Sequence, residues 1–377
     1  MKTTLIFMLC VAFCTIHIVT TAQTTGNKRS VFHFSFIPPL STHGSLAGEY
    51  TNGASVNLLA GISRNEDAFT FGGLANVIRH NAGGLQFTGL CNYTGNDGRG
   101  MQLGGLANIV GNSYRGFLFG GLINTAKDME GFQSGGLGNV ADSLKGLQLG
   151  GLINIAGQTK GVQFGGLGNI SGDMKGFQFG GLGNVSGHVD GFQFGGLFNI
   201  ARQVEGVQFA GLVNIAESCD YPIALLNIIR DGEYALGVSY NETGTTLLTF
   251  RSGGRITYGI LGVGYNHKTE GSGFTTEGGF GIHIPVTRWL RINNEIKGGV
   301  CSNFSDDPTF YTNYALLPAF RLNPHVEIFA GPSLNYLQSD DTANTKIFPD
   351  HSLWKKYGDS RLQQIYIGFQ AGAHYIF

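Results

Sequence analysis

A short phrase that recurs ten times between residues 68 and 217 constrains this chain more than any other feature. Two clear copies read GFQFGGLGN (176–184) and GFQFGGLFN (191–199), and the closing asparagine recurs after 16, 16, 16 and then six times 15 residues. These asparagines are Asn76, Asn92, Asn108, Asn124, Asn139, Asn154, Asn169, Asn184, Asn199 and Asn214. Each follows a Gly-Leu-x step. A fixed short period requires every unit to meet nearly the same surroundings, so the region predicts a repeat array.

Each unit is long enough for a strand and a turn but not for a strand and a helix, and its glycine content disfavours helix. In one copy Phe192, Phe194 and Phe198 alternate with Gln193 and Asn199, which is the period of two expected of a strand. The segments that join the copies carry nearly all of the charge, as in KDME at residues 127–130. We expect these joining segments to be turns.

Two all-β structures can use such a unit. In a solenoid each copy is one rung, and the stacked asparagines hydrogen-bond from rung to rung. In a closed antiparallel barrel each copy is one membrane strand, and successive turns on opposite sides of the membrane usually differ in length. The nearly constant joints favour the solenoid, as does the apolar residue that most of them carry, because a rung can turn that residue into its core. These apolar residues are Tyr114, Met129, Leu144, Met174, Val189 and Val204.

The chain begins with the features of a secretory signal. Lys2 precedes a mostly apolar run at residues 5–19, and small residues end at Ala22. We therefore expect residues 1–22 to be a signal peptide and the protein to be exported. Residues 23–67 are expected to form an N-terminal strand (31–37) and a cap, with a degenerate first unit at 55–62.

The last third of the chain follows a different pattern. After an array at residues 68–232, eight strands are predicted within residues 233–377, at about 234–241, 245–252, 255–266, 274–284, 289–301, 312–322, 325–337 and 364–377. In the fifth, apolar residues such as Leu290 and Ile296 oppose Arg291, Glu295 and Lys297. One apolar and one polar face is typical of a membrane barrel, which must close because every backbone group in lipid must pair.

The predicted connections and the last residues support an outer-membrane barrel. From the third strand onward long and short connections alternate, which is the habit of outer loops and periplasmic turns. The chain ends in Phe377 with Tyr375 two places earlier, and this pair resembles the terminal aromatic signal of such barrels. An even strand count then places both ends of the barrel, and the repeats that precede it, on the periplasmic side. A soluble β-sandwich is the competing interpretation.

The fold class expected is thus all-β: a β-solenoid-like array of 15-residue repeats followed by an eight-stranded antiparallel outer-membrane-type β-barrel. The alternative is one large β-barrel that includes the repeats. The net charge of −1 and the 13% of charged residues give no reason to expect nucleic-acid binding. Cys91, Cys219 and Cys301 lack the spacing of a disulfide framework or a zinc site. The repeats also lack calcium-binding and phosphate-loop patterns, so no cofactor and no metal is expected.

Few residues suggest chemistry. The repeat glutamines could line a sugar-binding face, but a structural ladder or an ordinary polar strand face is the favoured interpretation; they are Gln86, Gln102, Gln133, Gln148, Gln163, Gln178, Gln193 and Gln208. Ser339, Asp340, Asp341 and His351 in the last long loop are the candidates for a nucleophile and base, among residues typical of solvated loops. Inward Glu295 is expected to pair with Arg291 or Lys297 in the barrel interior. No catalytic residue is predicted.

The repeat G-[FVL]-Q-[FL]-G-G-L-x-N-[IV]-[AS], the opening FHFSFIPPLSTHG (32–44) and NLLAGIS (57–63) resemble the surface-repeat proteins of Gram-negative bacteria. The resemblance covers roughly residues 31–265. It implies an exported protein of unknown biochemical role and supplies no catalytic residues. We expect a non-catalytic structural or binding protein of the outer membrane or cell surface. Its expected partners are outer-membrane lipid and an envelope or extracellular protein or glycan. A porin-like channel with the repeats as membrane strands is the alternative, and an enzyme is third.

Overall fold

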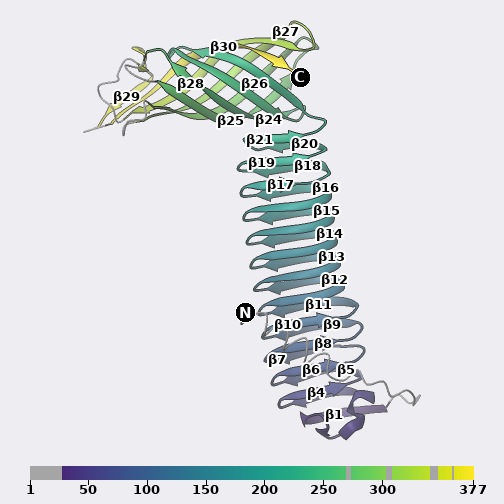
Figure 1. The fold of residues 1–377 in the computed structure, drawn as a ribbon. Helices are drawn as coiled ribbons and strands as arrows, with labels where there is room; N and C mark the ends of the chain where they lie inside the picture. The colour runs from purple at the N-terminus through teal and green to yellow at the C-terminus, as the bar shows by residue number, and fades with distance from the viewer. Residues whose placement is uncertain (1–27, 269–272, 303–307, 340–346, 359–360) are drawn as a thin grey trace. The chain divides into compact units, whose positions relative to one another are not determined.

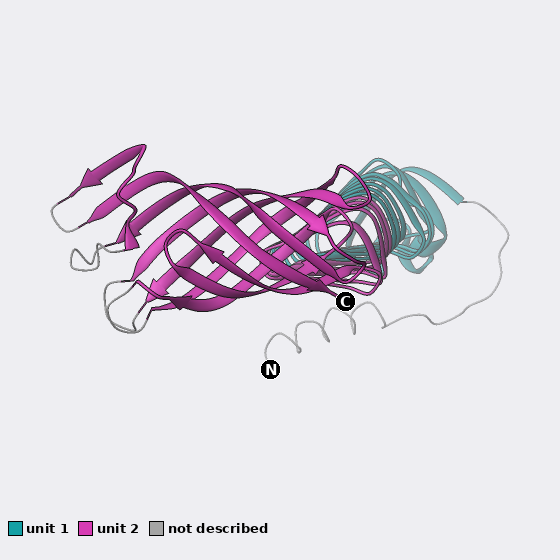
Figure 2. Ribbon diagram, turned by 90° about the horizontal axis from the view of Figure 1, so that it is seen from above, with its two compact units in different colours: residues 1–166 teal, residues 167–377 magenta. Residues whose placement is uncertain are grey.

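The computed structural model describes residues 28–268, 273–302, 308–339, 347–358 and 361–377, and these are almost entirely β-structure (Figure 1). The signal peptide expected at residues 1–22 lies outside the described residues. The chain divides into two compact units, residues 1–166 and 167–377, which Figure 2 colours separately. The division falls within one copy of the repeat (161–169), at its Gly-Leu step, so rungs occur in both units.

The first unit is a stack of β-rungs. Its elements are β1 (Lys28–Ile37), β2 (Leu40–Ser41), the 3-10 helix η1 (Gly44–Glu49), β3 (Tyr50–Asn57), β4 (Ala60–Ser63), β5 (Asn65–Gly72), β6 (Ala75–Ile78), β7 (Leu85–Thr88), β8 (Cys91–Thr94), β9 (Gly98–Gly104), β10 (Ala107–Val110), β11 (Ser113–Gly120), β12 (Ile123–Gly135), β13 (Gly138–Gly150) and β14 (Ile153–Gly165). Parallel pairing extends back to β1, which pairs with β3. The segment before the ten clear repeats is therefore part of the stack.

Neighbouring rungs pair in parallel and in register. Strand β12 pairs with β13 so that Asn124 lies beside Asn139 and Gln133 beside Gln148. Each residue therefore lies beside its equivalent one period away, which is the arrangement of a solenoid. The alternative of one large barrel built from antiparallel repeat strands is wrong.

The expectation that the charged joints are turns is also wrong. Residues 127–130 lie inside β12, and the bends between successive strands fall on the Gly-Leu steps, such as residues 136–137 and 151–152. The stacking of the bends explains this position: a Cβ on Gly151 would lie 2.0 Å from the carbonyl oxygen of Gly136 in the preceding rung. A second change of direction uses Gly146, whose φ of +142° is a conformation that L side chains rarely adopt.

The apolar residue of each joint lies in the rung interior, as the sequence predicts. In the first unit Tyr114, Met129 and Leu144 are buried and belong to one hydrophobic cluster. In the second unit Met174, Val189 and Val204 belong to another. A column of such residues gives most rungs an apolar centre next to polar columns on the same inner surface, and in one rung buried Thr159 takes that place.

The second unit contains further rungs and the barrel. Its rung strands are β15 (Gly168–Gly180), β16 (Gly183–Gly195), β17 (Phe198–Ile200), β18 (Gln203–Ala210), β19 (Val213–Ala216), β20 (Ser218–Ile223) and β21 (Leu226–Ile229). The barrel strands are β22 (Glu233–Asn241), β23 (Thr245–Gly253), β24 (Thr257–Asn266), β25 (Phe274–Pro285), β26 (Leu290–Ser302), β27 (Thr309–Arg321), β28 (Val326–Ser339) and β30 (Leu362–Ile376), with the short β29 (Trp354–Tyr357).

The barrel is closed and antiparallel. Each strand pairs with the next, β28 pairs with β30, and β30 returns to pair with β22 through registers such as Val238 with Ala373. These eight strands match the eight predicted ones closely, and their tilt is visible in Figure 2. Strand β29 was not predicted; it pairs with the start of β30 next to the last long loop.

Candidate functional site

The asparagine that defines the repeat is buried inside the rungs and links them. In the first unit the Nδ2 of Asn139 donates to the Oδ1 of Asn154 at 2.9 Å, and Asn124 donates to Asn139 at 2.9 Å. In the second unit Asn184 donates to Asn199 at 2.9 Å in the same way. The predicted rung-to-rung hydrogen bonding of asparagine is thereby confirmed. It is a structural ladder of buried amides that are satisfied by one another.

The second amide hydrogen of each asparagine is used within the next turn of the chain. Asn139 also donates to the carbonyl oxygen of Leu149 at 2.8 Å, and Asn184 to that of Phe194 at 2.8 Å. One asparagine side chain thus donates one hydrogen bond to the next rung and a second to a backbone carbonyl of its own rung. The ladder also extends past the ten predicted members. Asn57 donates to Asn76 at 3.0 Å, and Asn214 donates to Asn227 at 3.0 Å.

A second ladder consists of the repeat glutamines. Gln148 donates to Gln133 at 2.7 Å, and Gln163 to Gln148 at 2.8 Å; in the other unit Gln193 donates to Gln178 at 2.8 Å. All eight repeat glutamines are fully buried. The structural-ladder interpretation is therefore correct, and these side chains cannot form an exposed sugar-binding face.

One rung interrupts the glutamine ladder. Leu118 is paired in register with both Gln102 and Gln133, at a position where eight of the ten copies have glutamine, and it is completely buried. The Oε1 of Gln102 and the Nε2 of Gln133 have no hydrogen-bond partner. An apolar residue in this column thus leaves one acceptor and one donor unpaired, one on each side.

The outer surface of the rungs is apolar around the Gly-Leu bend. Phe194, Leu197, Phe198 and Ile200 follow one another around one bend, and each is between 36% and 45% exposed. Other rungs repeat the pattern with Phe117, Leu122, Leu137, Leu152, Ile153, Ile155, Phe164, Leu167, Ile170, Phe177, Leu182, Val185, Leu212 and Ile215. We call this surface the apolar rim. The alternation in the sequence does not reveal this surface, because it indicates which residues share a face but not which face is inside.

Apart from Glu66, which is buried in the interior, most charged residues of the rungs lie in the segments that join the copies, at the edge opposite the Gly-Leu bends. Lys175 and Asp190 form an ion pair at 2.6 Å, and Arg115 pairs with Glu130 at 2.8 Å, with all four side chains at least half exposed. Such exposed pairs contribute little to stability. Their position still separates a charged edge from the apolar rim, so the rungs are amphipathic in cross-section.

The barrel has an outward apolar surface bounded by aromatic side chains. Tyr240, Tyr265, Phe274 and Phe310 lie at the end of the long loops, and Trp289, Phe320, Tyr375 and Phe377 lie at the end of the short turns. Exposed aliphatic side chains between them include Val238, Leu248, Leu261, Val263, Ile282, Ile296, Leu316, Ile328, Leu334 and Ile367. An aliphatic band between two aromatic girdles is typical of barrels that cross a membrane.

The barrel interior contains a charge-balanced network. The Nε of Arg251 donates to Glu295 at 3.0 Å, and Lys297 contacts the other oxygen of Glu295 at 3.0 Å. The expected pairing of Glu295 with Lys297 is therefore confirmed, whereas Arg291 pairs with Glu327 at 2.8 Å. Among the described residues, ion pairs of the interior join four Arg or Lys side chains (Arg251, Arg291, Lys297 and Arg321) to four carboxylates (Glu233, Glu277, Glu295 and Glu327).

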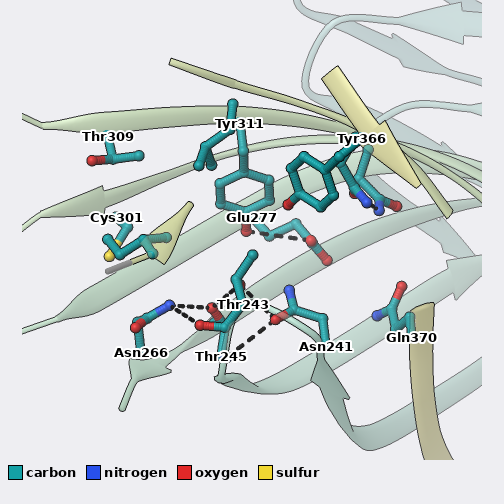
Figure 3. Close-up of a pocket in the computed structure, with 14 residues that line it drawn as sticks. Asn241, Thr243, Thr245, Asn266, Glu277, Cys301, Thr309, Tyr311, Tyr366 and Gln370 are labelled. Carbon is teal, nitrogen blue, oxygen red and sulfur yellow. Dashed lines mark hydrogen bonds between the residues drawn. The ribbon is translucent and has the colours of Figure 1, made fainter. Parts of the chain in front are cut away.

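Toward the long loops the interior narrows to a small polar cavity (Figure 3). Asn266 donates to Thr245 at 2.8 Å, Tyr311 donates to Glu277 at 3.3 Å, and the enclosed volume is about 20 Å³. That is room for about one water molecule. Ile347 and Phe348, from the last long loop, are buried in a hydrophobic cluster beside this cavity.

Of the candidate nucleophile and base residues, the structure describes Ser339 and His351, which make separate contacts. The hydroxyl of Ser339 accepts from Thr309 at 2.9 Å, and Nε2 of His351 contacts the carbonyl oxygen of Ile367 at 2.8 Å. Asp340 and Asp341 lie outside the described residues. Within the described ranges no three His, Cys, Asp or Glu side chains are grouped so as to hold a metal ion.

The two terminal aromatic residues lie where the barrel closes. Tyr375 faces outward, stacked on His325 with ring centroids 5.8 Å apart, and meets the ring of Phe377 edge-on at 5.5 Å. The amide of Phe377 donates to the carbonyl oxygen of Tyr234 at 3.0 Å. The last residue thus fastens the end of the chain to the first barrel strand, β22.

The last rung packs against the outside of the barrel wall. The amide of Asn227 donates to the hydroxyl of Ser252 at 3.0 Å, and the hydroxyl of Thr257 donates to the carbonyl oxygen of Pro222 at 2.9 Å. Gly259 and Gly278 are also outward positions, and Cβ atoms there would lie 2.1 Å from Ala224 and 3.3 Å from Leu225. The wall therefore carries glycine under the rung, where neighbouring outward positions carry large apolar side chains.

Comparisons with known proteins add little. No family model matches the chain, and no curated protein matches it. A solved structure titled "De novo design of transmembrane beta-barrels" matches 38% of this chain and 93% of its own length, at 15% identity and a TM-score of 0.23. A similarity at that level carries no argument here. Among the described residues, no helix has the length and apolar character needed to cross a membrane.

Proposed function

We propose that this is an exported outer-membrane protein in which the barrel is a membrane anchor and the solenoid is a non-catalytic structural or binding element. The observation that carries the proposal is the contrast between the two barrel faces. An aliphatic band between aromatic girdles suits lipid, and the interior is filled by paired charges. A barrel of eight strands fills its interior with side chains, which suits an anchor better than a pore.

The lengths of the connections support an orientation. The turns at residues 254–256, 286–289 and 322–325 are short. At the other end the connection at 242–244 is also short, but the three that follow, at 267–273, 303–308 and 340–361, are longer. Short turns face the periplasm in outer-membrane barrels. The chain enters the barrel at Glu233 from that same end, so the proposed orientation puts the solenoid on the periplasmic side. This differs from the exposure on the cell surface that the family resemblance implies.

Production of the full chain in a Gram-negative host tests the anchor. We expect the protein in the outer-membrane fraction, resistant to carbonate extraction and with a heat-dependent mobility on gels, because a closed barrel in lipid unfolds only on heating. A Phe377→Ser variant should assemble less well than a Phe274→Ser variant, which changes an aromatic residue at the other end. Recovery of the wild-type chain as a soluble protein would refute the proposal.

Planar-bilayer recordings separate the anchor from a channel. The purified chain should give no steady conductance of the size that open porins show, because paired charges cross its interior. A stable conducting state in the wild-type protein would favour the channel interpretation. The Glu295→Ala variant is the matched comparison, since it removes the central carboxylate of the network.

A further inference from the structure

The apolar rim raises the question of what covers it. Soluble monomers rarely expose a continuous apolar surface of this kind, and such a surface marks contact with a partner or a membrane. In the second unit alone Phe177, Leu182, Phe194, Leu197 and Leu212 contribute to it, each at least 39% exposed. The interior of the rungs is filled by the two amide ladders and the apolar column, so these side chains have no place inside.

Charge is excluded from the rim. Between residues 167 and 230 the acidic and basic residues all occupy the opposite edge: Asp173, Lys175, Asp190, Arg202, Glu205, Glu217, Asp220 and Arg230. An element with one apolar side and one charged side suits the boundary between lipid and water. A specific protein partner would more commonly be met by polar groups among the apolar ones.

The rim is continuous with the lipid-facing wall of the barrel. The last rung rests on outward positions of β23, β24 and β25, with Leu225 in contact with Gly278 about halfway along β25. Outward positions near this contact, such as Val263 and Ile282, are large, apolar and exposed. The rung thus occupies wall area that lipid covers elsewhere in the proposed membrane barrel. Its exposed Ile228 lies beside the exposed Ile215 of the preceding rung.

The first unit has an open groove along its own rungs. It has a volume of about 620 Å³ and runs across successive rungs between in-register Phe71, Phe87, Leu103 and Phe119. Its floor is formed by Gly-Gly pairs such as Gly104–Gly105. A long, apolar groove without charged side chains matches an acyl chain better than a polar ligand.

We propose that the apolar rim of the solenoid binds phospholipid acyl chains of the leaflet at the short-turn end of the barrel, with the charged edge in water. This inference rests on the proposed function, because it takes the barrel to be in the membrane. The rungs of the second unit are then membrane-surface elements. The lipid headgroups then contact water and the charged edge of the rungs.

Quenching by brominated phospholipids tests the proposal in the full chain reconstituted into phosphatidylcholine liposomes. In a Trp289→Phe/Trp354→Phe background, single tryptophans are introduced as Phe194→Trp on the rim and Gln203→Trp on the charged edge. Ile296→Trp, on the outward barrel wall, reports barrel insertion. We expect bromolipid to reduce the fluorescence of F194W and I296W by about twofold or more and to leave Q203W nearly unchanged.

The outcomes separate the two proposals. Quenching of I296W without quenching of F194W would overturn lipid binding by the rim and leave the membrane anchor standing. Absence of quenching in I296W would remove both. Protection of F194W from bromolipid and from aqueous iodide alike would show that a second copy or another protein covers the rim, and would also overturn the proposal. If F194W fails to assemble, Phe198→Trp, on the other side of the same Gly-Leu bend, repeats the test.

Discussion

The interrupted glutamine ladder makes a sharp prediction about a single buried position. Leu118 is completely buried between Gln102 and Gln133, and it leaves the Oε1 of the first and the Nε2 of the second without partners. In the uninterrupted part of the ladder, equivalent side chains bond at 2.7–2.8 Å. Leu118→Gln should therefore complete the ladder, since its amide can donate to Gln102 and accept from Gln133.

The magnitude follows from two opposing contributions to the free energy of unfolding. Loss of the buried leucine costs about 1.5–3 kcal/mol. Pairing two buried polar groups recovers about 1–3 kcal/mol each. We expect L118Q to be neutral or stabilising. Leu144 is also buried, at 1% exposure, but lies in the apolar column. L144Q loses the same burial and places its amide between Met129 and Thr159, where no amide ladder continues, so it should destabilise by about 3 kcal/mol or more.

Hydrogen exchange of the full chain in lipid, read by mass spectrometry, measures both variants. Peptides from β13 and its neighbours should exchange about a hundredfold faster in L144Q than in the wild type, and peptides from β11 and β12 should not accelerate in L118Q. Rung arrays couple mainly to nearest neighbours, so distant rungs serve as an internal control. Equal acceleration in the two variants would refute the view that the ladder column is a polar one.

Three further predictions concern charge and titration. Glu295→Ala should lower the urea midpoint of the barrel by the equivalent of about 3–5 kcal/mol, because Arg251 and Lys297 lose the carboxylate between them. The double variant Arg251→Met/Glu295→Leu should lower the midpoint less, and equal midpoints would contradict this. Burial lowers the pKa of His33 to about 4. The contribution of His33 to the free energy of unfolding is then complete above pH 6.5 and is lost as the pH falls toward 4. His33→Asn should therefore flatten the pH dependence of hydrogen exchange at residues 28–57 between these pH values. An unchanged dependence would exclude His33 as its cause. Burial raises the pKa of Cys219 to about 12, so at pH 8 iodoacetamide should modify it about a thousandfold more slowly than in denaturant, and similar rates would contradict its burial.

Much of the architecture could be predicted because two periods are written into the sequence. The fifteen-residue period requires equivalent residues to stack, which led to the solenoid and to the asparagine ladder. The period of two in the last third gave the barrel faces, with Arg291 and Glu295 inside and Leu290 and Ile296 outside, as observed. Both inferences depend on local pattern alone.

The turns could not be located in the same way. The charged joints have the composition of turns, but a solenoid rung can keep charged residues on a strand edge in water, as residues 127–130 do in β12. The bends need glycine for a reason that only stacking reveals: the carbonyl of Gly136 leaves no room for a Cβ on Gly151. Composition therefore pointed to the wrong part of the unit.

The inside and outside of a rung were also beyond the sequence. Apolar residues are usually buried, yet Gln193 is fully buried here and Phe194 is 39% exposed. The ladder overrides that preference, because stacked amides hydrogen-bond to each other and their burial therefore costs little free energy. The surface on which the last rung packs could not be predicted either. Gly259 and Gly278 resemble any glycine in a strand, and only the structure shows Ala224 and Leu225 packed against them.

The most direct test of the whole account is the accessibility of two engineered cysteines in intact cells. In a variant without the native cysteines, Lys355→Cys lies near the long loops and Lys160→Cys on the charged edge of a rung. A membrane-impermeant maleimide should label K355C in intact cells and K160C only after the outer membrane is permeabilised. That result would agree with a barrel that spans the outer membrane with its solenoid in the periplasm. Labelling of K160C in intact cells would contradict this orientation, and labelling of neither cysteine in intact cells would contradict insertion of the barrel with its long loops outside.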